Sequence, residues 1–451
     1  MLQSDKPVPE EVFSVLRSGL DRRTFLRATA AIAAATPMMG ALAPDHAQGA
    51  PNRSAGDRLD GSVLQPHTGK IRGTYVPSTV ENVRWGRLPN SEGEPVATVA
   101  SGSVVTFDTV SHEGILEDQG RDPIAYFGDN GVPSDEVLQD AIAIASSDLV
   151  HDFDFDGPHI VTGPVFVRGA ERGDVLAVDV LEIRPRVPYG VISNRHGKGA
   201  LPGEMPPGPV PPNTTPPAER GNVSVFCSVA KRRGRLRGVL PDGGAGATFP
   251  LAPFPGIMGV AVDVERDGIT PEPDRQGETP DEIDSVPPTV AGGNLDIQDL
   301  AVGSRLYLPV FAPGALFFTG DPHLAQGHGE VALTALESSM RITFRLTLFK
   351  KGDVAIPGDP LAFDRPFAET PEFWIPVGLS DYMPGTPTPG DVNLAMRAAV
   401  REALDFLGEE LGMDRAVAYA YLSAATDFVV SQFVDRSTGV HALIRKADFG
   451  H

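Results

Sequence analysis

The chain has 451 residues, 22% of them charged and 41% apolar, which is an ordinary balance for a globular protein. Its formal net charge of −21 repels nucleic acids and anionic membrane surfaces, so neither is an expected partner. The 49 glycines and 43 prolines favour turns and short strands over long helices, and the single cysteine excludes an intrachain disulfide.

Residues 1–50 carry the pattern of a twin-arginine export signal. The pair Arg22 and Arg23 is followed by Phe25, Leu26 and an alanine-rich apolar run, which is too short to be a lasting membrane span. We expect removal at one of the alanines that end this stretch, and therefore a periplasmic or secreted mature protein. The alternative is an amphipathic helix that is not cleaved.

After the signal we expect short strands and turns. WGRL and SVVTFDT are the clearest strands of Val83–Phe107. Ser134–Ile144 is predicted to be a short surface helix, with Ser134 as its capping residue. Phe166–Ile183 is predicted to form two strands joined by the glycine-containing turn GAERGD.

The segment His151–Gly163 alternates Asp with Phe, so an extended strand places its three aspartates on one face. Two interpretations stay open, an acidic edge strand with solvated carboxylates or part of a functional site. Of this segment we favour His159 as the functional residue over Asp152, Asp154 and Asp156.

Five features between residues 190 and 290 lack a clear motif. Asn194–Glu204 lacks the spacing of a phosphate-binding loop, and it either closes over a small substrate through His196 and Lys198 or is a simple surface loop. Cys227 lies in an apolar strand-like run, which favours a buried inert thiol over a nucleophile.

The other features of this region are a proline-dense loop, a basic run expected to make salt bridges or a subunit contact, and an acidic exposed excursion. They are, in order, Gly208–Pro217, Lys231–Arg237 and Asp263–Pro288.

Polar residues with metal-ligating chemistry are concentrated in Ala291–Val331, in glycine-interrupted turns beside the apolar strands RLYLPV and ALFFT. Asp321 and His323 are two residues apart, so on extended backbone both point to one side, and Glu330 returns after a glycine turn. Carboxylate and imidazole together suit a catalytic zinc-like ion, whereas Asn and Asp oxygens alone suit calcium or magnesium.

The C-terminal third is predicted to contain one strong strand and two helices. Met340–Phe349 alternates as a half-buried antiparallel strand, with Arg341 and Thr343 on the outer face. Asp391–Gly412 is a helix that Asp391 opens, and a second helix from Asp414 leads into a closing strand. The predicted fold is mostly β, a sandwich or barrel with a small α/β portion near the C-terminus, divided roughly at 51–190, 191–350 and 351–451.

The central stretch resembles the signature of the acetamidase/formamidase family. His159–Pro185, Phe254–Ala261 and Ala420–Ala442 resemble other conserved blocks of that family. The resemblance implies a β-rich fold, hydrolysis of short amides to ammonia and a carboxylate, and assembly into homodimers or larger homo-oligomers. One departure is His328, which stands where the family commonly has an acidic residue.

From these observations we assign roles at a site for a small-molecule amide and a divalent metal, with zinc as first choice and iron or calcium as alternatives. Asp321 and His323 are expected to bind the metal, with Asn294 and Asp296 as further ligands. Glu330 is either a ligand or the general base, and His159 is the second catalytic residue. His196, Lys198 and Gln326 are assigned to substrate binding.

Two alternatives remain beside the linear amidase. One is a cyclic-amide hydrolase acting on lactam or hydantoin-like rings, and the other is a periplasmic small-molecule or metal-binding protein without turnover. A Ser-His-Asp hydrolase is disfavoured, because no Gly-x-Ser-x-Gly motif occurs.

Overall fold

The computed structural model describes residues 63–154, 156–207, 221–232, 234–241, 246–263, 267, 283–351, 365–380 and 390–450. Asn52–His451 form one compact unit, separate from Met1–Pro51. The predicted export signal, the proline-dense loop Gly208–Pro217 and most of the acidic segment Asp263–Pro288 lie outside the described residues. No helix within the described ranges is both long and apolar enough to cross a membrane.

Nine of the described strands form the first sheet, which is antiparallel except where β1 runs parallel to β5. Its order is β1 (Thr74–Val76), β5 (Ser103–Thr109), β18 (Met340–Phe349), β7 (Val175–Pro185), β15 (Arg305–Pro309), β19 (Phe367–Glu369), β20 (Phe373–Leu379), β22 (Gly439–Arg445) and β21 (Asp427–Gln432).

The second sheet is built around β16 (Phe317–Ala325), which pairs with three strands. The main path is β11 (Thr248–Pro250), β10 (Arg235–Val239), β9 (Asn222–Arg232), β8 (Tyr189–Arg195), β17 (Leu336–Glu337), β16, β12 (Phe254–Gly259) and β14 (Gly292–Asn294). β6 (Ile160–Val167) pairs with β16, and β2 (Val83–Trp85) and β4 (Ala97–Val99) pair with β6, while β3 (Arg87–Leu88) and β13 (Ile283–Asp284) form a separate small pair.

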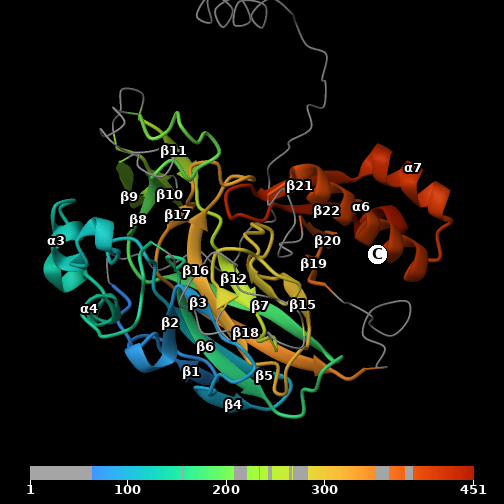
Figure 1. The fold of residues 1–451 in the computed structure, drawn as a ribbon, viewed down its shortest axis with the longest axis horizontal. Helices are drawn as coiled ribbons and strands as arrows, with labels where there is room; N and C mark the ends of the chain where they lie inside the picture. Colours follow the sequence, from blue (N-terminus) through green and yellow to red (C-terminus); the bar gives the residue numbers. More distant parts are fainter. Residues whose placement is uncertain are drawn as a thin grey trace, which may run out of the picture. The chain divides into compact units, whose positions relative to one another are not determined.

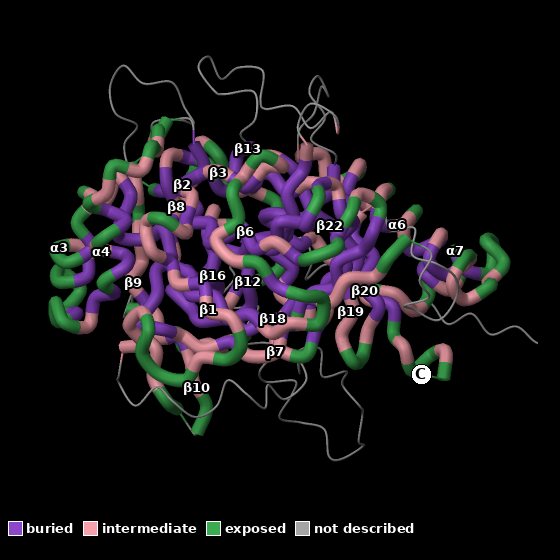
Figure 2. The backbone as a smooth tube through the Cα atoms, turned by 90° about the horizontal axis from the view of Figure 1, so that it is seen from below, coloured by how far each residue is buried: buried purple, intermediate pink, exposed green. Residues whose placement is uncertain are grey.

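The two sheets pack face to face through an apolar core. Phe107 of β5 and Phe344 of β18 belong to the first sheet, and both rings meet Phe317 of β16 edge-on, with centroids 5.8 and 5.4 Å away. These contacts bury the inward faces of both sheets (Figure 2, purple), so the mostly β fold expected from the sequence is confirmed, and of the two expected forms it is a sandwich.

Helices cover the sandwich at two places. α3 (Pro123–Gly128) and α4 (Gln139–Ala145) pack with β8 through a cluster that includes Phe127 and Tyr189. α6 (Val392–Glu409) and α7 (Arg415–Ala425), in red in Figure 1, lie beside the β19–β22 end of the first sheet. Short 3-10 turns occupy Val80–Asn82, Glu117–Gln119, Ser134–Glu136 and Lys446–Phe449.

The C-terminal predictions hold in outline. Asp391 caps α6 by accepting from the Asn393 amide, and Asp414 caps α7, which leads into β21. The first half of α6 packs on the sheet through Ala395 and Ala399, and its second half through larger apolar residues such as Phe406, whose ring meets Trp374 of β20. The small side chains of the two alanines let the helix approach the backbone of β20 closely.

The half-buried strand predicted at Met340–Phe349 forms with those bounds as β18, but its outer face is not solvated near the start. Arg341 and Thr343 are both buried. The Arg341 guanidinium donates to both carboxylate oxygens of Asp108, at 2.5 and 2.8 Å, and lies over the ring of Tyr75. The ionic partner is thus the residue directly across from Arg341 on β5, and the carbonyls of Gln65 and Thr68 cover the pair. Periodicity alone reveals neither contact.

Two other sequence predictions are wrong. Ser134–Ile144 is not one helix capped by Ser134, because Val137 is extended and α4 begins only after Leu138. The Gln65 side chain donates to the carbonyl of Val137 and accepts from the amide of Gln139, which stabilises this break.

The acidic alternation at His151–Gly163 does not form a strand before Ile160. Asp152 accepts from the Asp154 amide, and Asp156 accepts from the Asp152 amide, so the carboxylates cap a turn instead. The turn predicted between the strands of Phe166–Ile183 does form, with Gly169 and Gly173 at positive φ, but it links one sheet to the other.

Gly378 of β20 provides a test of the α6 packing. A Cβ at this position would lie 2.0 Å from the Ala399 nitrogen and 2.5 Å from the Ala395 carbonyl oxygen. We expect Gly378→Ala to reduce the free energy of unfolding by about 1–3 kcal/mol or more, because backbone must move. Chemical denaturation measures this loss. Gly128→Ala is the matched control, since a Cβ there meets nothing within 4 Å, and an equal effect of the two variants would contradict the packing described.

Candidate active site

Asp321 and His323 lie on β16, and their side chains point the same way, as their spacing predicts. The Asp321 Oδ2 atom is 2.9 Å from Nε2 of His323. Asp321 has φ of 50°, a left-handed conformation that non-glycine residues rarely adopt. The strand is locally distorted to bring this carboxylate beside the imidazole.

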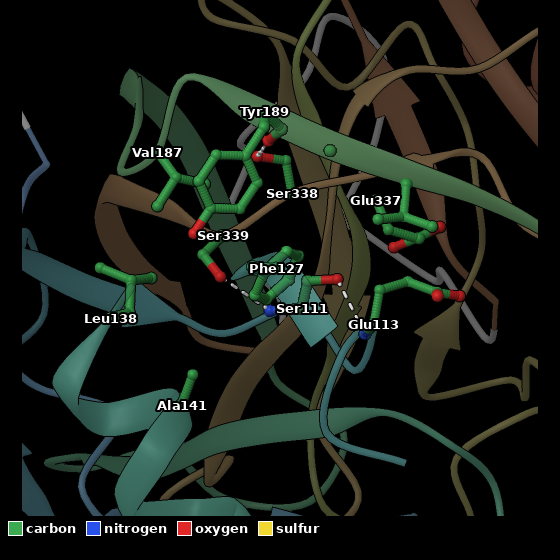
Figure 3. Close-up of a pocket in the computed structure, with 12 residues that line it drawn as sticks. Ser111, Glu113, Phe127, Leu138, Ala141, Val187, Tyr189, Glu337, Ser338 and Ser339 are labelled. Carbon is green, nitrogen blue, oxygen red and sulfur yellow. Dashed lines mark hydrogen bonds between the residues drawn. The ribbon is translucent and has the colours of Figure 1, made fainter. Parts of the chain in front are cut away.

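Glu337 joins them from the neighbouring strand. It sits directly across from His323 in the β16–β17 pairing, and its Oε1 is 3.0 Å from the same Nε2. Figure 3 shows Glu337 and Glu113 on the side of a small pocket opposite the apolar side chains of Leu138 and Val187. Glu337 and Glu113 are the charged residues among those that line this pocket. Ser111 and Ser338 use their hydroxyls in hydrogen bonds with the backbone of Glu113 and Tyr189.

Asp296 approaches His323 from the other side, just after the end of β14. Its Oδ1 is 3.6 Å from Nδ1 of His323, and its φ is 49°. Room for this approach comes from Gly256 of β12, where a Cβ would lie 2.5 Å from both Asp296 Oδ1 and Asp321 Oδ2. Only a glycine lets the two carboxylates converge over β12.

Glu330 and Asp435 complete the acidic part of the cluster. Glu330 closes the turn after Gly327, with φ of 48°, and its Oε1 is 3.9 Å from His323 Nε2. One oxygen each of Asp296, Glu330 and Asp435 lies within 4.8 Å of the others. Asp435 comes from the loop after β21, so the C-terminal part of the chain also contributes to this cluster.

Two more histidines face the second oxygen of Asp321. Nε2 of His159 is 3.7 Å from Asp321 Oδ1, and Nδ1 of His112 is 4.0 Å from the same atom. The other ring nitrogen of His159 shares a 2.8 Å hydrogen bond with the Ser285 hydroxyl. Asp321 therefore has one oxygen directed at His323 and the other at this histidine pair.

The cluster contains more carboxylates than its imidazoles can balance, and this imbalance perturbs their pKa values. Burial and the neighbouring carboxylates raise the pKa of Asp296 to about 7, and they raise the pKa of Glu330 and of Asp435 well above the usual range. Burial opposes ionisation of His323, but the carboxylates of Asp321 and Glu337 raise its pKa well above the usual value.

Asp321 and His159 shift downwards. Burial disfavours the Asp321 carboxylate, yet the adjacent imidazoles of His323 and His159 lower its pKa below the usual range. Burial lowers the pKa of His159 to about 4, so this ring is neutral near pH 7. Neutral imidazole and ionised carboxylate are the forms that coordinate metals.

A bound cation fits this donor set. Buried atoms without a hydrogen-bond partner include both ring nitrogens of His323, both carboxylate oxygens of Asp296 and Oδ1 of Asp321. The Nε2 atom of His323 is 2.9 Å from Asp321 and 3.0 Å from Glu337, but neither contact has the angles of a hydrogen bond. Orphaned buried acceptors that converge are costly unless a cation joins them, and a mixed carboxylate and imidazole set suits zinc or iron.

A cavity of about 800 Å³ opens onto the cluster. Asp321, Glu330, Glu337, Asp435, His112, His159 and Asn294 reach its wall, together with the apolar side chains of Leu116, Phe153, Leu333 and Phe433. A small molecule bound there would lie against the acidic and imidazole groups while apolar residues surround the rest of it.

The structure brings most of the residues predicted from sequence to this place. Asn294, Asp296, Asp321, His323, Glu330 and His159 lie in the cluster or on the cavity wall, and Lys198 lines the cavity too. His196 does not line it, because its ring turns to Asp118, with Nε2 at 3.3 Å from Oδ2. His328 lies on the exposed side of its loop beside Gln298, outside the cavity lining, so the departure from the family pattern does not alter this wall.

Gln326 lies behind the cavity wall rather than on it. Its amide donates to the carbonyl oxygens of Asp296 and Ser431, each at 3.0 Å. Gly329 also donates to the Ser431 carbonyl, at 3.1 Å. These bonds join the Asp296 turn and the Glu330 turn to β21, which makes Gln326 a positioning residue in this geometry.

Sequence reasoning missed His112, Glu337, Asp435 and Glu113. His112 and Glu113 follow the strand β5, and a His-Glu pair at a strand end is a usable signal. Glu337 and Asp435 stand in segments without a motif. Their proximity depends on strand register and on the loop after β21, which the sequence does not display.

Two nucleophile mechanisms find no support among the described residues. Cys227 is buried in β9, and burial raises the pKa of its thiol to about 11. Ser431, His441 and Asp299 form a hydrogen-bonded chain, with distances of 2.7 and 3.1 Å, but Ser431 is fully buried and does not line the cavity. A serine without access to substrate cannot attack it.

Comparison with known proteins identifies the family of this chain and agrees with its β-sandwich fold. A sequence model of the Acetamidase/Formamidase family matches residues 135–265 and 273–444, which is well over half of the chain. The chain therefore belongs to the acetamidase/formamidase family.

The named relatives have low sequence identity to this chain, but their alignments cover more than half of it. An acetamidase of Mycolicibacterium smegmatis is 28% identical over 304 residues, covering 58% of this chain and 72% of the relative. A formamidase of Methylophilus methylotrophus is 27% identical over 293 residues, covering 58% of this chain and 70% of the relative.

The fold is also found in solved structures. An acetamidase from Yersinia enterocolitica has a TM-score of 0.59 at 22% identity, and the match covers 84% of this chain and 94% of that one. An acetamidase from Bacillus halodurans has a TM-score of 0.56 at 22% identity, with 83% and 98% covered. At this identity the likeness confirms the fold and nothing finer.

Gly256 tests whether convergence of the two carboxylates matters. In Gly256→Ala the new methyl group pushes Asp296 and Asp321 apart, and we expect affinity for zinc to fall by about 10–100-fold. Metal affinity of purified protein, measured by competition with a chromophoric chelator, checks this. Gly128→Ala again serves as control, and unchanged affinity of Gly256→Ala would contradict the proposed geometry.

The pKa shifts predict how stability of metal-free protein depends on pH. Asp296, Glu330 and Asp435 have folded-state pKa values above their unfolded values, so the folded protein binds more protons and stability falls as pH rises through the folded values. The lowered pKa of His159 makes stability increase with pH, but only below pH 6.5, the ordinary pKa of a histidine. Between pH 6.5 and about pH 8 we therefore expect the chelator-treated protein to lose thermal stability.

Two additions sharpen this pH measurement. Glu330→Gln removes one titrating group, so its melting temperature should fall less over the same range. Zinc binds the deprotonated ligands, so it should stabilise the protein more at about pH 8 than at pH 6.5. A melting temperature that rises across this range in metal-free protein, with no difference for Glu330→Gln, would refute the assigned shifts.

Proposed function

We propose that this chain is an amidohydrolase that cleaves the C–N bond of short linear amides, releasing ammonia and a carboxylate with the help of a divalent metal. The observation that carries the proposal is that buried oxygen and nitrogen atoms of Asp296, Asp321 and His323 converge beside a cavity without hydrogen-bond partners. Family membership and relatives named acetamidase and formamidase support amide hydrolysis as the activity.

Asp321, His323 and Asp296 are the residues that would hold the metal, with Asn294 or Glu337 as further ligands and with zinc as first choice over iron or calcium. A divalent metal at such a site supplies Lewis acidity, which polarises an amide carbonyl and lowers the pKa of water to about 7. The neutral ring of His159 and the ring of His112 add two more donors on the other side of Asp321.

Glu330 is positioned to move protons. It is buried, lines the cavity and lies beside the metal-binding imidazole of His323. With the charge of the neighbouring carboxylates offset by a bound cation, the ionised carboxylate of Glu330 would accept a proton from the attacking water and return it to the departing nitrogen, which the C–N cleavage requires. The apolar wall at Leu116, Phe153 and Phe433 excludes bulk water around the bound amide.

A second candidate is a hydrolase of cyclic amides. The specific observation in its favour is the cavity of about 800 Å³, which falls in the range that accommodates drug-sized ligands and far exceeds formamide. The same groups would open a lactam-type ring.

The export signal leads us to propose a periplasmic or secreted enzyme, and kinship leads us to propose a homodimer or larger homo-oligomer. Folded export also suits a protein that binds its metal before it crosses the membrane. A periplasmic binding protein without turnover is the remaining alternative, which the following assay separates.

Ammonia release from formamide, acetamide and propionamide tests the proposal directly. We expect turnover by zinc-loaded or iron-loaded protein, and its loss on treatment with a chelator. Asp321→Asn should bind less metal and lose activity by more than about a hundredfold. Glu330→Gln should keep its metal and still lose about 10²–10⁴ in kcat, because only the proton path is removed.

The outcomes separate the alternatives. Ammonia release that survives chelation would remove the metal mechanism, and absence of turnover on all amides would favour the binding protein. Faster cleavage of small lactams than of linear amides would favour the cyclic-amide enzyme.

A further inference from the structure

One wall of the cavity carries basic side chains that amide hydrolysis itself does not need. Arg195, Lys198 and Arg436 line the same cavity as Asp321 and Glu330. Arg195 ends β8, Lys198 lies in the turn that follows, and Arg436 lies in the loop between β21 and β22. Three cations on one wall stand out in a chain whose net charge is −21.

Arg195 has buried donors that are not used. The residue is 5% exposed, and one guanidinium nitrogen is paired with Glu113, yet its Nε and its other terminal nitrogen are buried without a hydrogen-bond partner. The nearest further acid, Asp118, is 3.7 Å from that terminal nitrogen, too far for a hydrogen bond. Asp118 instead accepts from Asn222 at 2.9 Å. Unused guanidinium donors on a cavity wall call for an acceptor from a ligand.

Lys198 supplies a second charge at the same place. Its amide donates to the Arg195 carbonyl at 3.0 Å, which fixes the turn, and its ammonium has no ion pair within the ranges that the structure describes. Burial against this wall, together with the charges of Arg436 and Arg195, lowers the pKa of Lys198. Arg436, which is 2.8 Å from Asp284, adds to the positive potential from the opposite loop and has φ of 63°.

We infer that the substrate of this site carries a carboxylate at the end remote from its amide, held by Arg195 and Lys198 while the amide lies at the acidic cluster. This inference rests on the proposed function, since it names the substrate class of that activity. The class is the half-amides of short dicarboxylic acids. Water adds to the amide carbon, the C–N bond breaks, and the products are a dicarboxylate and ammonia.

The charge distribution explains why such a wall is required. A strongly acidic protein repels an anionic substrate. The ammonium of Lys198 and the unused donors of Arg195 offset this repulsion locally and also orient the molecule, because its carboxylate end is attracted to them. A neutral amide such as acetamide gains nothing from these side chains, and it fills little of the cavity.

The test compares substrates that differ only in this charge. Malonamate, succinamate and glutaramate are each paired with the neutral amide of the same carbon number, propionamide, butyramide and valeramide. For the best-fitting pair we expect kcat/KM to favour the anionic amide by about 10–100-fold, the contribution of charged hydrogen bonds. Lys198→Met should reduce that ratio by about tenfold or more, and Lys198→Arg should restore most of it.

A binding measurement keeps the inference distinct from the proposed function. By calorimetry, succinate should bind the zinc-loaded protein more tightly than butyrate, and Lys198→Met should abolish the difference. Equal kcat/KM for every charged and neutral pair would overturn the inference while leaving the amidase standing. If no amide is cleaved but the Lys198-dependent preference for succinate persists, the carboxylate subsite stands and the proposed function fails. Succinate and butyrate binding equally would overturn the subsite in either case.

Discussion

His323 and the carboxylates around it form the constraint on which the rest of the site depends. Nε2 of this buried imidazole is within 3.0 Å of oxygens from both Asp321 and Glu337, and Asp296 approaches Nδ1. Burying so many carboxylates without a matching positive charge is unfavourable, and the protein tolerates it only by holding protons on several of them or by binding a cation. Both responses leave the cluster sensitive to what occupies the cavity, which is a useful property in a catalytic centre and a poor one in a purely structural core.

The surrounding backbone is arranged to keep these groups together. Asp296, Asp321 and Glu330 all have positive φ, a strained conformation for residues with a side chain, and such strain persists only where neighbouring structure imposes it. Gly256 leaves the space, Gln326 ties two of the turns to β21, and the chain from Ser431 through His441 to Asp299 braces that strand from behind. The stability of the sandwich thus supports a local arrangement that would otherwise relax.

The sequence predicted the mostly β fold and the local part of the site, for identifiable reasons. Asp321 and His323 obey the two-residue period of a strand, and the glycine turn before Glu330 has a recognisable composition. Glu337 joins the cluster through the register of β16 against β17, and Asp435 and His112 arrive from segments more than a hundred residues away, so no local pattern announces them. The failed strand at His151 and the failed helix at Ser134 have a common cause, because side-chain bonds to backbone amides compete with regular structure.

We propose that one cation is held between Asp321 and His323 on β16. An anomalous difference map from crystals of protein purified with its metal retained, recorded on both sides of the zinc absorption edge, tests this most directly. We expect a peak within coordination distance of Asp321, His323 and Asp296, at about 2.0–2.2 Å from their nitrogen and oxygen atoms. A fully loaded, active protein whose anomalous peak lies elsewhere, with these side chains hydrogen-bonded only to one another, would contradict it.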